Sequence, residues 1–157
     1  MAQFGFVSPL RTRSVKREIH YLNTDIDLVA QQNLELLTAA LGSRGVFALH
    51  VSQSDDGRWH AGLETDEQFN HPEPNIVALV MAIEALDPHF RALWSACTSR
   101  EFNIGYECGD APWAFNHELT AATLARVAAL GVSLRITLYP PDTATSEPSE
   151  STPDTTA

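Results

Sequence analysis

The chain has 157 residues and a formal net charge of −10, with four basic side chains and no acid in residues 1–17, and six arginines against twenty carboxylates in the remainder. So acidic a body repels phosphate backbones, which excludes nucleic acid as the main ligand. No apolar run approaches the roughly 18 residues of a membrane span, so we expect a cytoplasmic protein without a membrane partner.

The composition divides the chain into three parts. Residues 1–17 form a basic arm that we expect to be flexible, and residues 18–140 have the composition of a single folded domain. Residues 141–157 contain only Pro, Ser, Thr, Ala, Asp and Glu, so this acidic tail is too polar to offset the entropy lost on ordering and is predicted to be disordered. Cys97 and Cys108 lack a metal-ligand partner in sequence, which predicts two separately packed thiols, with a disulfide as the alternative.

Residues 18–28 alternate between apolar and polar side chains, which predicts a first strand. Leu22, Ile26 and Leu28 are expected on one side, with three oxygen-bearing residues, Asn23, Asp25 and Asp27, on the other. Paired carboxylates suit acid-base or magnesium chemistry, but Asp27 lies just before a predicted helix at residues 31–41. We therefore interpret Asp27 as a helix cap that interacts with the dipole.

Residues 46–53 and 58–65 are predicted to form a hairpin around Asp55-Asp56-Gly57, with Gly57 in the left-handed conformation. In that register one face of the hairpin packs on the core, and its members are Phe47, Leu49, Val51, Trp59, Ala61 and Leu63.

Two helical segments follow the hairpin. Pro74 falls in the first turn of a helix whose buried stripe continues to Leu86, and Asp87-Pro88 begins a second helix that carries Trp94 and Cys97. A strand is predicted over 101–108, with Phe102, Ile104 and Tyr106 facing inward. Thr120 then caps a helix that Gly131 ends, and residues 132–139 form the last strand.

This order of elements, βαββααβαβ, predicts the fold class. We expect a single α+β domain with a mainly antiparallel five-stranded sheet and helices on one face, as a variant of the ferredoxin-like fold.

The outer face of the hairpin holds the first candidate site. His50 is expected opposite Gly62 and diagonal to His60 and Glu64, at distances of about 8 Å that allow convergence on a metal ion. A solvated sheet face explains the same pattern, because a half-buried strand carries polar residues outward in any case. Gly62 also leaves a gap that a ligand or partner backbone could approach.

The second candidate site is an acidic and aromatic patch on the last third of the domain. Trp113 lies in a predicted loop and either covers the sheet edge or is an exposed anchor for a partner. Together with Glu101, Glu107 and Asp110 it suits a basic protein partner. No nucleophile elbow, phosphate-binding loop or dinucleotide fingerprint is present, so we predict neither a catalytic residue nor a cofactor.

The closing stretch, together with Trp59 directly after the hairpin turn, resembles an uncharacterised bacterial α+β family of about this length. Some relatives of that family are thought to act as immunity proteins that neutralise toxins by binding them, so the resemblance implies binding and no catalytic residue. It covers about a third of the chain and is carried by Leu119-Thr120, Leu124, Ala125, Ala128, Gly131, Ser133, Leu134, Ile136, Leu138 and Tyr139.

Three functional hypotheses follow. The first is a non-enzymatic protein-binding module, an immunity or accessory protein whose acidic surface engages a basic protein partner through Glu64, Glu101, Glu107, Asp110 and Trp113. The second is a small metal-dependent or acid-base enzyme centred on His50, His60 and Glu64. The third is an oligomeric structural component that pairs through an edge strand such as the last one.

Overall fold

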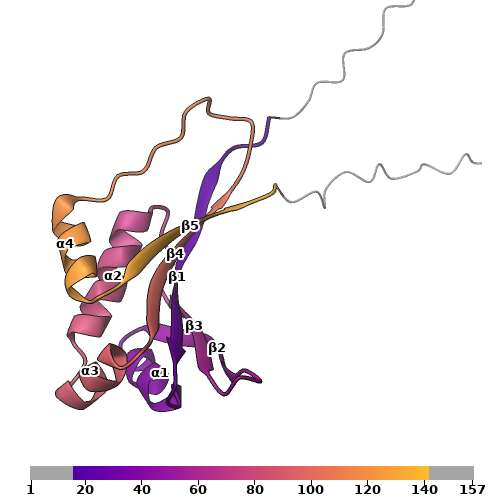
Figure 1. Cartoon of the computed structure of the whole chain (residues 1–157). Helices are drawn as coiled ribbons and strands as arrows, with labels where there is room; N and C mark the ends of the chain where they lie inside the picture. Colours follow the sequence, from indigo (N-terminus) through magenta and orange to yellow (C-terminus); the bar gives the residue numbers. More distant parts are fainter. Residues whose placement is uncertain (1–15, 142–157) are drawn as a thin grey trace, which may run out of the picture.

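The computed structural model describes residues 16–141, which form a sheet with a layer of helices on one side (Figure 1). Apart from Lys16, Arg17 and Pro141, the predicted arm and tail lie outside the described residues. The elements in chain order are β1 (His20–Ala30), α1 (Glu35–Gly42), β2 (Val46–Gln53), β3 (Trp59–Thr65), α2 (Pro72–Glu84), α3 (Pro88–Ser95), β4 (Ser99–Glu107), α4 (Ala121–Ala129) and β5 (Ser133–Tyr139).

The five strands form one open sheet in the spatial order β2-β3-β1-β4-β5. The pairings β2–β3, β3–β1 and β1–β4 are antiparallel, whereas β4 and β5 are parallel. The α+β class is therefore confirmed, but the sheet is mixed, and this corrects the predicted ferredoxin-like arrangement. The difference arises at the last connection, because α4 carries the chain back along the sheet and so makes β5 parallel to its neighbour.

The core lies between the sheet and the helices. Ile26 and Leu28 of β1 are fully buried, and so are Ile76, Leu79 and Ile83 of α2, which confirms the predicted helical stripe. These side chains recur at the spacing that places them on one helix face, toward the sheet.

Two β-bulges change which side chains reach this core. The register of β1 shifts between Tyr21 and Asn23, so Tyr21 is buried and Leu22 is exposed. The register of β2 shifts between Ala48 and His50, which leaves Leu49 exposed and puts Phe47 opposite Glu64 on the outer face. The predicted inward positions of Leu22, Phe47 and Leu49 are therefore wrong, because one extra residue reverses the alternation of sides.

The predicted cap at Asp27 is also wrong. β1 continues to Ala30 and α1 begins only at Glu35, whose backbone N–H donates to Oδ1 of Asn33 at 2.7 Å. Asp27 thus lies inside the strand, away from any helix end.

Other local predictions are confirmed. Gly57 and Gly131 have φ values of 81° and 66°, as the hairpin turn and the helix end require. The side chain of Thr120 accepts a hydrogen bond from the backbone N–H of Thr123 and caps α4. Cys97 and Cys108 are both free thiols.

The first and last described segments lie beside the same part of the chain. The carbonyl of Arg17 accepts hydrogen bonds from the backbone N–H groups of Asp110 and Ala111, and that of Tyr139 accepts one from Cys108. Residues 108–111 therefore hold the start of the domain and the end of β5 at one end of the sheet (Figure 1).

Candidate functional site

Among residues 16–141, no helix covers the outer face of the sheet, since all four described helices lie on the opposite side (Figure 1). Along this face, Glu101 lies opposite Asp27, and Asn103 opposite Asp25, in the β1–β4 register. The carboxylates on this side of the sheet come from three adjacent strands, and they are Asp25, Asp27, Glu64, Glu101 and Glu107.

Within the described residues, Arg135 of β5 is the arginine that pairs with this row of carboxylates. Its guanidinium forms an ion pair with Glu101 and lies 3.7 Å from a carboxylate oxygen of Asp27. Asp25 and Glu64 form no ion pair within residues 16–141, so the negative charge in the middle of the face is uncompensated there.

Asp25 and Glu64 instead share one hydrogen-bond donor. The side-chain amide of Asn23 donates to Oδ1 of Asp25 at 2.9 Å and to Oε2 of Glu64 at 2.7 Å. Burial, followed by the charges of Glu64 and Asp27, raises the pKa of Asp25 to about 6. A pair of this kind gains stability from any cation that approaches it.

A network of buried polar groups holds Asn23 in place. Asn75, fully buried in the first turn of α2, donates from its amide to the hydroxyl of Tyr21 and to Oδ1 of Asn23, both at 2.8 Å. The Tyr21 hydroxyl bonds Thr24 at 2.7 Å, and burial raises the pKa of Tyr21 to about 12, so it stays neutral. The helix layer therefore fixes the orientation of an amide on the outer face.

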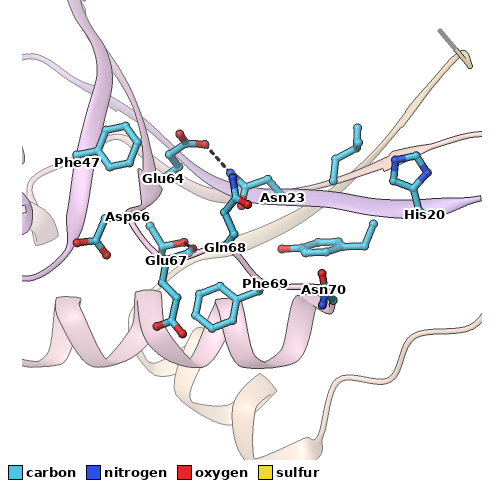
Figure 2. Close-up of a pocket in the computed structure, with 12 residues that line it drawn as sticks. His20, Asn23, Phe47, Glu64, Asp66, Glu67, Gln68, Phe69 and Asn70 are labelled. Carbon is cyan, nitrogen blue, oxygen red and sulfur yellow. Dashed lines mark hydrogen bonds between the residues drawn. The ribbon is translucent and has the colours of Figure 1, made fainter.

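A hollow of about 530 Å³ lies beside Glu64, at the end of the sheet (Figure 2). It forms because β1 begins at His20 and pairs with β4 along its length, whereas β3 ends at Thr65 and leaves the start of β1 open on that side. The connection 66–70 closes the other side. Its lining combines acids with aromatic rings, namely Glu64, Asp66, Glu67, Tyr21, Phe47 and Phe69.

The lining chemistry of the hollow suits a cationic group. Carboxylates supply hydrogen-bond acceptors and charge, and the faces of aromatic rings attract a guanidinium or ammonium group. Among the lining residues the basic side chain is His20, at the outer end of β1 (Figure 2). We therefore treat the hollow and the adjoining carboxylates Asp25, Asp27, Glu64 and Glu101 as one surface, the acidic face.

The predicted metal ligands share a face but do not converge. His50 lies over Gly62, where an added Cβ would be 2.5 Å from Cε1 of His50, so the histidine fills the predicted gap. His60 lies 3.2 Å from the hydroxyl of Ser54, and Glu64 accepts from Asn23. Among residues 16–141, no three His, Cys, Asp or Glu side chains are placed to hold a metal ion.

The predicted partner-binding residues are spread over the molecule. Glu101 and Glu107 are six residues apart on β4, or about 20 Å along a strand, and Glu107 contacts Nε2 of His20 at 3.2 Å. Asp110 and Trp113 lie in the loop between β4 and α4. Trp113 is fully exposed and does not cover the sheet edge, whereas Phe115 packs against the ring of Tyr106.

Asn75 was missed as a site residue, and Asp25 was considered for acid-base or magnesium chemistry but was not assigned to the binding surface. The alternation of Asp25 and Asp27 with Ile26 and Leu28 placed both acids on one side of a strand, but Asp27 was interpreted as a helix cap and the pair was not joined to Glu64. The signal for Asn75 is a single amide beside the buried stripe of an apolar helix, since a buried amide needs hydrogen-bond partners.

Comparisons with family models, curated proteins and solved structures found no match for this chain. Within residues 16–141, none of the helices has the length and apolar character needed to cross a bilayer. The resemblance to a family with immunity-protein relatives therefore stays a prediction.

Proposed function

We propose that this protein is a non-enzymatic binding module, an immunity or accessory protein that engages a basic protein partner through the acidic face. The observation that carries the proposal is a sheet face without covering helices on which Asp25 and Glu64 lack a cationic partner within the described residues. Asp25, Glu64 and the other carboxylates of the acidic face attract positive charge. They therefore raise the rate at which the protein encounters a basic partner.

The hollow supports the same proposal in finer detail. An arginine side chain of the partner fits its combination of carboxylates and aromatic rings, because the guanidinium bonds carboxylate oxygens while its plane stacks on a ring. Phe47 lies beside Glu64 in the lining of the hollow, as Figure 2 shows, so ring and carboxylate are both within reach of one side chain.

Trp113 provides a second contact in this proposal. A fully exposed tryptophan offers a large apolar area, and tryptophan is over-represented among the residues that dominate binding energy. It would act together with Asp110 in the loop that follows β4, at some distance from Glu64.

The test uses an oligoarginine peptide as probe and the full chain. We expect the double variant Asp25→Asn/Glu64→Gln to bind the peptide about tenfold more weakly than wild type, and binding to weaken with rising salt. The measurement is fluorescence anisotropy of the labelled peptide.

The matched control is Asp55→Asn/Glu35→Gln, which removes the same two charges from exposed positions on the hairpin tip and α1. This control is expected to bind within about twofold of wild type. If both double variants lose the same affinity, net charge alone governs binding and the acidic face is not a site.

A further inference from the structure

Within residues 16–141, β5 is an edge strand of the sheet, and it carries exposed apolar side chains. Leu134, Ile136 and Leu138 are 37%, 66% and 65% exposed. In the parallel register they lie beside Phe102, Ile104 and Tyr106, so they face the helix side of the sheet. Their exposure shows that the helices leave this row uncovered.

An apolar groove continues the row. A hollow of about 440 Å³ is lined by Ile136 and Leu138 together with Ile19, Tyr106 and Phe115. Apolar surface of this kind, next to a strand that has no second neighbour in the described part of the chain, is typical of an interaction site.

The two edges of the sheet differ in how they are protected. On the opposite edge, the bulge at Leu49 interrupts the pairing of β2, and bulges of this kind discourage edge-to-edge contact. β5 pairs with β4 through seven consecutive residues with no register shift, and Pro140 follows only after the strand ends. Its one charged residue, Arg135, is engaged by Glu101 on the outer face.

We propose that β5 is the contact through which two copies of this chain associate, paired antiparallel about a twofold axis at Ile136. In this register Ile136 meets Ile136 of the partner subunit, and Leu134 meets Leu138 of the partner subunit. All three apolar side chains of each copy are then buried on the same side of a sheet that continues across both copies.

The charge pattern favours a second copy over a charged partner. Because Arg135 lies opposite Thr137 of the partner subunit, the pairing brings no like charges into register and buries no carboxylate. Pairing β5 with itself also closes after two copies, whereas pairing β5 with β2 would continue into filaments. The inference is independent of the acidic face, which lies on the other side of the sheet.

The first test is the solution mass of the full chain by light scattering after gel filtration. We expect twice the 17.2 kDa of one chain, and a single-copy mass for Ile136→Lys and for Leu138→Lys. The control is Leu36→Lys on α1, which is equally exposed at 65% and is expected to leave the dimer intact.

The second test is disulfide cross-linking between two copies. It avoids introducing a charged side chain, which could unfold the protein. Under mild oxidation Ile136→Cys should form an intersubunit disulfide, because cross-strand positions at a twofold axis bring the two Cβ atoms within bonding reach. Wild type, with its two free cysteines, and Leu36→Cys should show no comparable cross-link. A wild-type chain that is monomeric at about 100 µM, or a dimer that survives both lysine variants, overturns the proposal.

Discussion

Asp25 lies in an environment that is unusual for a carboxylate on the surface of a strand. It is half-buried, it faces Glu64 and Asp27, and its pKa is raised to about 6. The pKa of this carboxyl is near 3.8 in the unfolded state, so the folded state binds the proton more tightly. The contribution of Asp25 to the free energy of unfolding is therefore lost as pH rises through about 4 to 6. At neutral pH the carboxylate therefore opposes folding.

Asp25→Asn is accordingly expected to stabilise the protein at pH 7.5. After allowance for the exposed half of the side chain, the gain is about 1 kcal/mol in the free energy of unfolding. The gain should vanish near pH 4, where the wild-type carboxyl is itself neutral. Urea denaturation at the two pH values measures it, with Asp55→Asn as an exposed control; an equal gain at both values would contradict the interpretation.

Single residues also mark where sequence reasoning reached its limit. Alternation along β1 predicted the sides of Ile26, Asp25 and Asp27 correctly up to the bulge, and it failed at Leu22 beyond it. A bulge inserts one extra residue into a strand, and here that residue is an ordinary apolar one. The sequence alone therefore does not indicate where the bulge lies. The acceptors of the Asn75 amide group, Tyr21 and Asn23, come from β1, more than fifty positions away, and depend on tertiary packing.

At the scale of elements, one arginine joins the ends of two helices to the sheet. Nη1 of Arg100 on β4 donates to the carbonyls of Trp94, Ser95 and Cys97 at the end of α3, and Nε donates to that of Gly131 after α4. Positive charge is favourable at helix C-termini, where carbonyls lack partners within the helix.

Arg100→Lys is expected to lower the free energy of unfolding by about 1 to 3 kcal/mol, because a single ammonium cannot reach carbonyls on both helices and leaves some without a partner. Chemical denaturation measures the loss. Arg126→Lys, which alters an exposed pair with Glu84, serves as the matched control and should cost less. Equal effects of the two changes would show that Arg100 does not join the helices.

Elements were predicted better than their arrangement. The hairpin turn at Gly57, the cap at Thr120 and the stripe of α2 rest on local chemistry, and each is present. The hollow was not predictable, because it depends on how far β1 extends past the end of β3.

At the scale of the whole molecule, a cluster of rings ties the long loop between β4 and α4 to the rest of the fold. His117 lies 3.1 Å from Nδ1 of His71, just before α2, and 3.1 Å from the hydroxyl of Tyr106 on β4. Its ring also packs against Phe115 at 4.7 Å between centroids. Burial, followed by the proximity of His71, lowers the pKa of His117 below its usual 6.5.

The direction of this pKa shift predicts that the protein becomes less stable in acid. The folded state binds the proton less readily than the unfolded state, so the contribution of His117 is complete above about pH 6.5 and is lost as pH falls below it. We expect His117→Gln to be less stable than wild type by about 1 kcal/mol at pH 7.5, with a gap that narrows at pH 5.5. Thermal unfolding of both proteins at the two pH values measures this difference in stability. A difference that grows at pH 5.5 would contradict the predicted contribution of His117.

Both ends of the domain lie beside residues 108–111, and this makes the chain suitable for circular permutation. Since Arg17 and Tyr139 each bond this short stretch, a brief linker would join them, and new termini opened between Asp55 and Asp56 would interrupt no strand. A circularly permuted chain of this kind keeps every pairing of the sheet, and any protein fused to the new ends would project from the hairpin tip, away from the loop that carries Trp113.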